Sequence, residues 1–382
     1  MNQPKKVMLL FGTRPEAIKM APVARSLLAS PDFTPIITVT GQHRSMLDQV
    51  LRAFDLSPDH DLNIIRPRQT LPGLTKRLID GVDSALLLAQ PAAVLVQGDT
   101  TTTFASALTA FYHHIPVVHL EAGMRTGDMS RPYPEEMNRV LTARLSTLHL
   151  AATARARSHL LAEGTPASSV FVTGNTVIDA LHWTLSHHRV ITPFLLDILK
   201  SPRPMLLVTA HRRESWGEPL RQIAEAIAEL ARLEPDLLVL FPVHRNPAVG
   251  NTVRSILRNL PNVRLTQPLN YFDFVTIMQR ARIILTDSGG IQEEAPSLGI
   301  PVLVMRDNTE RLEAVEAGTS RLVGTSRHKI VDGVLQLLHD DALYLSMTTP
   351  ANPYGDGHAT GRVIAALRHL LHGAPAPAEF AP

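Results

Sequence analysis

Short apolar runs recur along the chain, and most of them are separated by segments with a helical pattern. The first half contains six runs that are rich in β-branched residues: Val7–Phe11, Pro35–Thr40, Ala93–Gln97, Pro116–Leu120, Leu148–Ala152 and Val170–Thr173. The second half contains six more: Met205–Ala210, Leu237–Val243, Val263–Thr266, Ile283–Thr286, Pro301–Met305 and Leu322–Gly324. Continuous apolar runs of this length are typical of strands that are buried on both faces, as in parallel sheets.

The segments between these runs predict helices, for example over Ser26–Ser30, Gln42–Phe54, Thr100–Tyr112, Glu218–Leu233 and Asn251–Leu260. Alternating strands and helices indicate an α/β fold with right-handed crossovers. The stretch Ala180–Pro204 has no strand pattern, so we interpret it as a helix and a connection between two doubly wound domains. A cleft between such domains is a common ligand site. Gly361–His372 predicts a last helix, and the Ala- and Pro-rich residues 374–382 predict a disordered tail.

The composition narrows the possible chemistry. The 382 residues include no cysteine, which excludes disulfides, a cysteine nucleophile, a thiolate zinc site and an iron–sulfur cluster. The 37 Lys and Arg residues nearly balance the 35 Asp and Glu residues, so no broad charge bias favours a nucleic acid or a membrane surface as partner. No apolar run approaches the roughly 20 residues of a membrane span. We therefore expect a soluble, cytoplasmic protein.

Polar residues gather where the predicted strands end. In the first half these clusters are 12–16, 41–44, 97–100 and 119–123, and in the second half 211–214, 244–246, 287–290 and 306–307. Ligands of open parallel sheets bind at the carboxyl ends of the strands. So many clusters at one predicted edge indicate an extended polar cleft.

Several of these residues have a purely structural alternative. Thr13 and Glu16 form the sequence of a capping box, although capping does not explain Arg14 or Lys19. Asp99 has the position of a plain N-cap for the helix that begins at Thr100.

Asp287–Glu294 is a more specific signal, because Gly289 and Gly290 stand at a predicted strand-to-helix turn. Glycines there let backbone N–H groups approach a phosphate, and Glu294 could accept a hydrogen bond from a ribose hydroxyl. The alternative is that the glycines serve only a tight turn. Neither a Walker A sequence nor a G-x-G-x-x-G fingerprint is present.

Residues 121–139 carry the densest charge, and Glu135 and Arg139 lie one helical turn apart after Pro134. Such a pair is normally a solvated surface feature, but here it follows a strand that itself ends in a carboxylate. Asp59-His60-Asp61 is better interpreted as a solvated loop than as a metal site.

Taken together, these motifs resemble the non-hydrolysing UDP-N-acetylglucosamine 2-epimerases. The similarity starts at Gly12–Pro22 and continues in order through residues 41–43, 97–100, 119–123, 134–139, 174–176, 209–214, 242–244, 287–294 and 306–311. It implies a GT-B architecture of two Rossmann-like domains around a cleft, with the last helix crossing back to the first domain. We therefore expect domains at 1–173 with about 361–373, and at 174–360.

The resemblance also implies an activity: reversible epimerisation at C2 of UDP-N-acetylglucosamine, by elimination of UDP to a 2-acetamidoglucal and re-addition. It implies no cofactor and no metal, a homodimer, and the supply of precursors for cell-surface polysaccharide. A GT-B glycosyltransferase and a catalytically silent nucleotide-sugar sensor are the alternatives.

Site residues follow from the same resemblance. Asp99, Glu121 and Glu135 are implied as acid/base carboxylates, with Arg139 and His211 acting on the leaving UDP or the sugar. The implied nucleotide contacts are Arg14, Lys19, His211, Arg212, Ser288, Gly289, Gly290 and Glu294. A second UDP-N-acetylglucosamine, bound as an activator, would contact Gln42, His43, Arg68 and His244.

Overall fold

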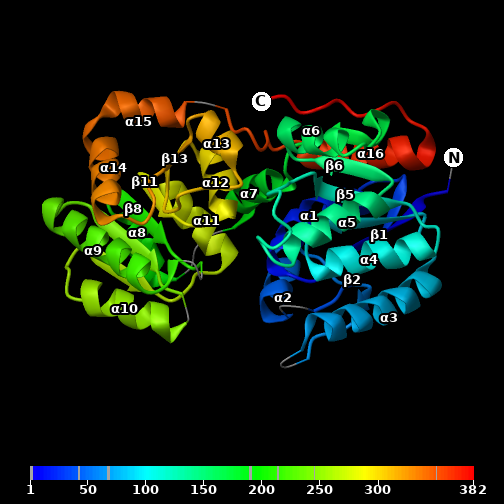
Figure 1. Ribbon diagram of the computed structural model, residues 1–382, viewed down its shortest axis with the longest axis horizontal. Helices are drawn as coiled ribbons and strands as arrows, with labels where there is room; N and C mark the ends of the chain where they lie inside the picture. Colours follow the sequence, from blue (N-terminus) through cyan, green and yellow to red (C-terminus); the bar gives the residue numbers. More distant parts are fainter. Residues whose placement is uncertain are drawn as a thin grey trace. The chain divides into compact units, whose positions relative to one another are not determined.

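The computed structural model describes residues 3–41, 44–66, 69–188, 192–212, 215–244, 246–349 and 351–382, and the chain divides into two compact units (Figure 1). Unit 1 comprises residues 1–180 and 354–382, and unit 2 comprises residues 181–353. The division falls inside helix α7 (Thr176–His187), seven residues after the predicted boundary. The start of this helix belongs to unit 1, where the Asn175 N–H donates to the Tyr354 carbonyl at 2.6 Å.

Unit 1 contains a parallel sheet of seven strands in the order β3-β2-β1-β4-β5-β6-β7. The strands are β1 (Lys5–Phe11), β2 (Phe33–Val39), β3 (His60–Asp61), β4 (Ala93–Gln97), β5 (Val117–Ala122), β6 (Leu148–Ala151) and β7 (Val170–Val172). Its other helices are α1 (Arg14–Leu28), α2 (Arg44–Ala53), α3 (Leu71–Ala89), α4 (Thr101–Tyr112), α5 (Glu135–Leu145), α6 (Ala154–Ala162), η1 (Ala167–Ser169) and α16 (Ala359–His372).

Unit 2 repeats this plan with six parallel strands in the order β10-β9-β8-β11-β12-β13. These strands are β8 (Met205–Thr209), β9 (Leu238–Pro242), β10 (Val263–Thr266), β11 (Ile283–Thr286), β12 (Val302–Val304) and β13 (Ser320–Leu322). The helices are α8 (Pro193–Lys200), α9 (Glu218–Leu233), α10 (Pro247–Leu257), α11 (Tyr271–Arg280), α12 (Gly289–Glu294), η3 (Ala295–Leu298), α13 (Leu312–Glu316), α14 (Arg327–His339) and α15 (Asp341–Thr348).

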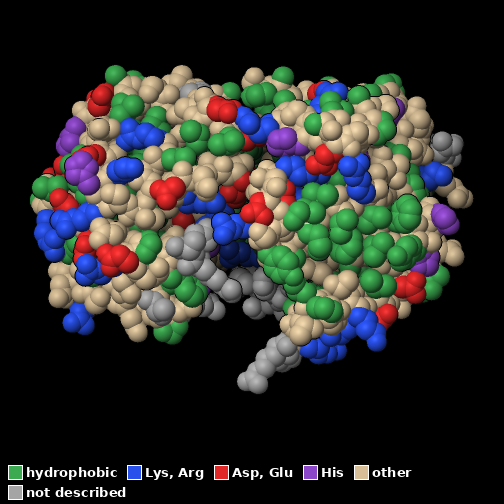
Figure 2. All heavy atoms as spheres, viewed as in Figure 1, with side chains coloured by type: hydrophobic (Ala, Val, Ile, Leu, Met, Phe, Trp, Pro, Cys, Tyr) green, Lys and Arg blue, Asp and Glu red, His purple; other side chains and the backbone are tan. Residues whose placement is uncertain are grey.

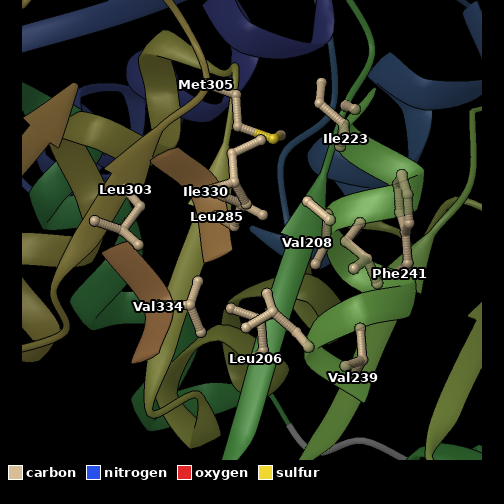
Figure 3. Packing of buried hydrophobic residues seen from close by; sticks show 14 of the residues in the cluster. Leu206, Val208, Ile223, Val239, Phe241, Leu285, Leu303, Met305, Ile330 and Val334 are labelled. Atoms are coloured by element: carbon tan, nitrogen blue, oxygen red, sulfur yellow. The ribbon is translucent and has the colours of Figure 1, made fainter. Parts of the chain in front are cut away.

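The core of unit 2 shows why the apolar runs form strands. Leu206 and Val208 of β8 pack with Phe241 of β9 and with Ile223 of α9, and all four are fully buried (Figure 3). Burying each such side chain stabilises the fold by about 1.5–3 kcal/mol. The predicted α/β class with two doubly wound parallel sheets is confirmed.

Both sheets reverse their strand order next to their first strand, between β1 and β4 in unit 1 and between β8 and β11 in unit 2. At such a switch point the two following loops diverge, which leaves a crevice at the carboxyl ends of the strands where ligands bind. The fold therefore predicts ligand sites at the loops after β1, β4, β8 and β11.

Two predictions about local secondary structure were wrong. Ser26–Ser30 does not form a helix of its own, because α1 starts at Arg14 and ends at Leu28. His60 and Asp61 form the short edge strand β3, because they pair with Thr38 and Val39 of β2, so they are not a loop, although Asp59 and Asp61 are exposed as expected.

The tail 374–382 is not disordered but lies against β7. The Phe380 N–H donates to the Val172 carbonyl at 2.8 Å, and the Phe380 side chain is buried.

Among the described residues, no helix is both long and apolar enough to cross a bilayer.

Candidate functional site

The loop after β1 is held by a capping box, as the sequence predicts. The Thr13 side chain accepts from the Glu16 N–H, and Glu16 accepts from the Gly12 and Thr13 N–H groups at 2.9 and 2.7 Å. The other Glu16 oxygen accepts from Thr100 at 2.6 Å, so this residue also ties the loop after β1 to the loop after β4. Burial raises the pKa of Glu16, against the lowering effect of these hydrogen bonds. Glu16 therefore serves as a support at the switch point.

Asp99 is not the N-cap of α4, so the purely structural role considered for it in the sequence analysis is wrong. Thr100 caps α4 instead, because its hydroxyl accepts from the Thr103 N–H. The Asp99 carboxylate pairs with Arg139 at 2.6 Å, and the Asn138 side chain donates to the Asp99 carbonyl at 2.9 Å. Asp99 is thus held by two residues of α5, forty residues further along the chain.

Glu121 lies at the end of β5 in an unusual backbone conformation. Its φ is +61°, and the register between β5 and β6 shifts between Leu120 and Ala122. A bulge of this kind turns a side chain away from the alternation of a regular strand. Lys19 contacts both carboxylate oxygens at 2.7 and 2.6 Å, Gln97 donates to one of them, and Asn175 lies 3.4 Å from the other.

Glu135 is the first residue of α5 and is half-buried. Burial raises the pKa of Glu135, and the nearby negative charge of Asp99 raises it further, while Arg139 and a backbone hydrogen bond oppose both effects. Arg139 is only 5% exposed and also lies 3.3 Å from Glu136, so the interpretation of Glu135 and Arg139 as a solvated surface pair is wrong.

In unit 2, His211 and Arg212 follow β8, and Asp287 follows the neighbouring strand β11. The His211 ring contacts Asp287 through Nδ1 at 2.8 Å, and the Asp287 side chain is fully buried. Arg212 pairs with Glu310 at 3.2 Å. Glu310 also contacts Arg306 and Arg311, each at 2.7 Å. Burial raises the pKa of Glu310, but the three arginines outweigh this effect and lower it well below its usual range.

The glycine turn has a structural purpose in addition to any binding role. A Cβ on Gly289 would lie 3.0 Å from the Arg311 guanidinium carbon, so this glycine makes room for the Arg311–Glu293 ion pair. Ser288 is the N-cap residue of α12 without a capping hydrogen bond from its side chain, and Gly290 is exposed. Glu294 is buried and accepts from the Tyr271 hydroxyl at 2.7 Å.

The structure thus brings the predicted residues together in two groups, one in each unit. Lys19, Asp99, Glu121, Glu135 and Arg139 surround the carboxyl ends of β4 and β5, with Arg14 half-buried at the start of α1. His211, Arg212, Ser288, Gly289, Gly290 and Glu294 follow β8 and β11. Of the predicted activator contacts, His244 is exposed and its Nδ1 accepts from the Asn246 N–H, whereas Gln42, His43 and Arg68 lie outside the described residues.

Sequence reasoning missed the partners that hold these groups: Gln97, Asn175, Asp287, Glu310 and Arg311. Gln97 and Asp287 stand in polar clusters at strand ends, and the other three stand in the motifs 174–176 and 306–311, so a signal was present. Its meaning depends on pairings between residues that are far apart in the chain.

Comparisons with known proteins show the family of the chain. The family model described as UDP-N-acetylglucosamine 2-epimerase matches residues 25–368. The UDP-N-acetylglucosamine 2-epimerase of Yersinia pestis is 52% identical over 372 residues, covering 95% of this chain and 98% of the relative. That of Escherichia coli K12 is 50% identical over 370 residues, with the same coverage.

A solved structure is similar along the same length. The crystal structure of UDP-GlcNAc 2-epimerase from Neisseria meningitidis bound to UDP-GlcNAc superposes with a TM-score of 0.88 at 46% identity, covering 95% of this chain and 99% of that one. The two Rossmann-like domains are accordingly of the GT-B type, and the chain belongs to the UDP-N-acetylglucosamine 2-epimerase family of isomerases.

Proposed function

We propose that the chain interconverts UDP-N-acetylglucosamine and UDP-N-acetylmannosamine by elimination and re-addition of UDP. A base takes the proton from C2 of the sugar, the C1–O bond breaks, and its electron pair goes to the pyrophosphate. UDP then adds back to the resulting 2-acetamidoglucal while C2 receives a proton on the opposite face. This reaction would take place in the cytoplasm and would supply N-acetylmannosamine-type precursors for cell-surface polysaccharide.

The observation that carries the proposal is the set of three carboxylates around the ends of β4 and β5. Asp99 and Glu121 each pair with a cation, Arg139 and Lys19 respectively. The pKa of Glu135 is raised, so this group is suited to hold a proton. A reversible elimination needs groups that accept and return protons, and carboxylates in different electrostatic settings can divide that work.

Negative charge that develops on the leaving UDP needs positive groups to receive it. We assign this role to Arg139 and His211, with Arg14, Lys19, Arg212, Ser288, Gly289, Gly290 and Glu294 as contacts of the nucleotide sugar. The relative from Neisseria meningitidis, which was crystallised with UDP-GlcNAc, supports this class of ligand.

Incubation with UDP-N-acetylglucosamine alone in D₂O tests the reaction. We expect the manno epimer to form with deuterium at C2, because the proton that returns comes from a group in exchange with solvent. The absence of exchange until an acceptor sugar is added would favour a glycosyltransferase. Binding of UDP without either outcome would indicate a nucleotide-sugar sensor.

An activating second UDP-N-acetylglucosamine is part of the proposal, with Gln42, His43, Arg68 and His244 as its contacts. Activation predicts a sigmoidal dependence of the initial rate on substrate concentration. A strictly hyperbolic curve would remove this part of the proposal and leave the reaction itself untouched.

We also propose a homodimer, formed through helices α3, α4 and α5 of unit 1. Large apolar side chains are exposed at the ends of α3 and α4: Leu88 is 74% exposed, Tyr112 65%, Leu87 61% and Phe111 53%. Helix α4 packs against α3 and α5, and Figure 2 shows hydrophobic side chains gathered over this part of unit 1. A contiguous exposed apolar surface is typical of a protein–protein contact, and a second copy of this chain is the partner proposed here.

A further inference from the structure

The His211 ring is the exposed member of a pair whose other member is fully buried. Its side chain is 48% exposed, and Nδ1 lies 2.8 Å from Oδ1 of Asp287, which has no exposed surface. Because Nδ1 faces the Asp287 carboxylate at ion-pair distance, the nitrogen that remains for a ligand is Nε2.

The second oxygen of Asp287 fixes the loop that carries the ring. Oδ2 accepts from the backbone N–H groups of His211 and Arg212 at 2.8 and 2.9 Å. Strands β8 and β11 are neighbours, and their last residues, Thr209 and Thr286, are joined through their hydroxyls at 2.6 Å. One oxygen of the carboxylate therefore anchors the backbone of the loop, and the other lies at ion-pair distance from the ring.

We propose that Asp287 is a positioning residue for His211, which holds the ring with its proton on Nδ1 and thereby presents Nε2 to the nucleotide sugar. The inference deepens the proposed function and rests on the role given there to His211. A neutral ring with its proton on Nε2 would direct the Nδ1 lone pair at a carboxylate oxygen. The negative charge of Asp287 at 2.8 Å disfavours that arrangement, so Nε2 faces the ligand in the same orientation whether or not it carries a proton.

The charge state of Asp287 agrees with this geometry. Burial by itself raises the pKa of this carboxyl, but the hydrogen bond and charge of His211 and the two backbone N–H groups outweigh burial and lower it. Asp287 is consequently an anion at neutral pH and can only accept at both oxygens.

The substitution Asp287→Asn separates positioning from a purely structural role. The two backbone N–H groups require an acceptor, so the amide oxygen takes the place of Oδ2 and the amide NH₂ faces the ring. The loop keeps its anchor, while Nδ1 must now accept and the ring proton moves to Nε2. We expect kcat to fall about 10²-fold while KM changes by less than about threefold.

A double-mutant cycle and ring NMR complete the test. In the His211→Asn background, Asp287→Asn should cause no further loss of kcat, because a positioning residue acts only through its partner. With ¹⁵N-labelled histidine, the His211 ring, assigned by its loss in His211→Asn, should carry its neutral proton on Nδ1 in the unmodified protein and on Nε2 in Asp287→Asn. The matched control is Asp273→Asn, which alters another Asp–His pair of unit 2, His188–Asp273 at 2.9 Å, and should change neither kcat nor the His211 signals.

Three results would overturn the proposal: a neutral His211 ring with its proton on Nε2 in the unmodified protein, a tautomer that Asp287→Asn leaves unchanged, or a changed tautomer with unchanged kcat. The NMR measurement on the unmodified protein needs neither turnover nor a folded variant. It therefore tests the positioning of His211 by Asp287 even if the protein proves not to be an epimerase. The D₂O experiment tests the epimerase reaction separately.

Discussion

Glu121 combines a strained backbone with a closely held side chain. A left-handed conformation costs a non-glycine residue about 1 kcal/mol or more, and it persists only where the surrounding structure enforces it. Here Lys19, Gln97 and Asn175 lie around the carboxylate, and they come from α1, β4 and the loop before α7. Strain maintained by three separate elements is typical of a functional residue.

Glu121→Gln removes the negative charge and keeps the shape of the side chain. We expect kcat for epimerisation to fall by about 10²–10⁴-fold, because the amide can neither take up a proton nor balance Lys19. UDP affinity, measured by calorimetry, should change by less than about threefold. Glu163→Gln is the matched control in unit 1, since Glu163 pairs with Arg125 and has no proposed role in the reaction. Near-normal turnover of Glu121→Gln would contradict the catalytic assignment.

Gly123 shows how a residue of a functional motif can have a packing role. Its φ is +90°, and a Cβ at this position would lie 2.1 Å from the Ala156 carbonyl oxygen of α6. The glycine is therefore required by the close approach of α6 to the end of β5, without reference to a ligand.

At the scale of elements, the tail after α16 has a structural role at the edge strand β7. Glu379 accepts from the Val172 N–H at 3.2 Å and pairs with Arg157 at 2.6 Å, while the Phe380 N–H donates to the Val172 carbonyl. An uncovered edge strand exposes unpaired backbone groups and invites aggregation. The tail thus satisfies backbone groups that β7 would otherwise expose.

Phe380→Ala should destabilise unit 1 by about 2 kcal/mol, because the buried ring is lost from the edge of the sheet. For a unit of this size the corresponding decrease in Tm is about 4–8 °C, measurable by calorimetry. Phe194→Ala is the control, since this ring of α8 is 41% exposed and its removal should lower Tm much less. Equal effects of the two substitutions would mean that the tail contributes nothing specific.

At the scale of the whole molecule, two buried histidines make stability depend on pH. Burial lowers the pKa of His119 to about 3 and that of His149 to about 4, with smaller contributions from neighbouring charges. Between about pH 6.5 and 4 the unfolded chain binds two protons that the folded chain does not bind. The contribution of these two histidines to the free energy of unfolding is therefore fully present above pH 6.5. It is lost as the pH falls, by up to about 1.4 kcal/mol per pH unit for each histidine.

The raised pKa of Glu16 acts in the opposite direction, so a difference between variants is the appropriate measurement. His119→Gln keeps a donor for the Gly98 carbonyl and should reduce the slope of unfolding free energy against pH by about 1.4 kcal/mol per unit. His328→Gln, at an exposed position of α14, is the control. A slope that is the same in His119→Gln and the unmodified protein would show that His119 does not titrate in this way.

The proposed dimer is tested at the same scale. Leu88→Lys together with Phe111→Glu places charges on the exposed apolar surface of α3 and α4. This double substitution should convert the dimer into a monomer at micromolar concentration, as measured by analytical ultracentrifugation. Leu345→Lys, at a position of α15 that is 59% exposed, should leave the mass unchanged. An unmodified protein that sediments as a monomer, or a charged variant that stays dimeric, would contradict the proposed surface.

The sequence by itself determined every strand except β3, the parallel arrangement of the strands and the positions of the polar clusters. It could do so because strands buried on both faces need continuous apolar runs, and because a capping box such as Thr13–Glu16 is encoded within four residues. The sequence also placed Asp99, Glu121 and His211 at strand ends. The motifs at these strand ends also carry the resemblance that indicated the family before any contact was known.

Only the tertiary structure decided how these side chains are paired. Lys19 reaches Glu121 across 102 residues, and His211 is close to Asp287 across 76, so no local pattern could show either contact. Tertiary contacts also placed the boundary of the units within α7 and the tail against β7. The physical reason is that periodicity and capping act over one or two turns, whereas the charge state and orientation of a side chain depend on whichever distant groups the fold brings within a few ångströms.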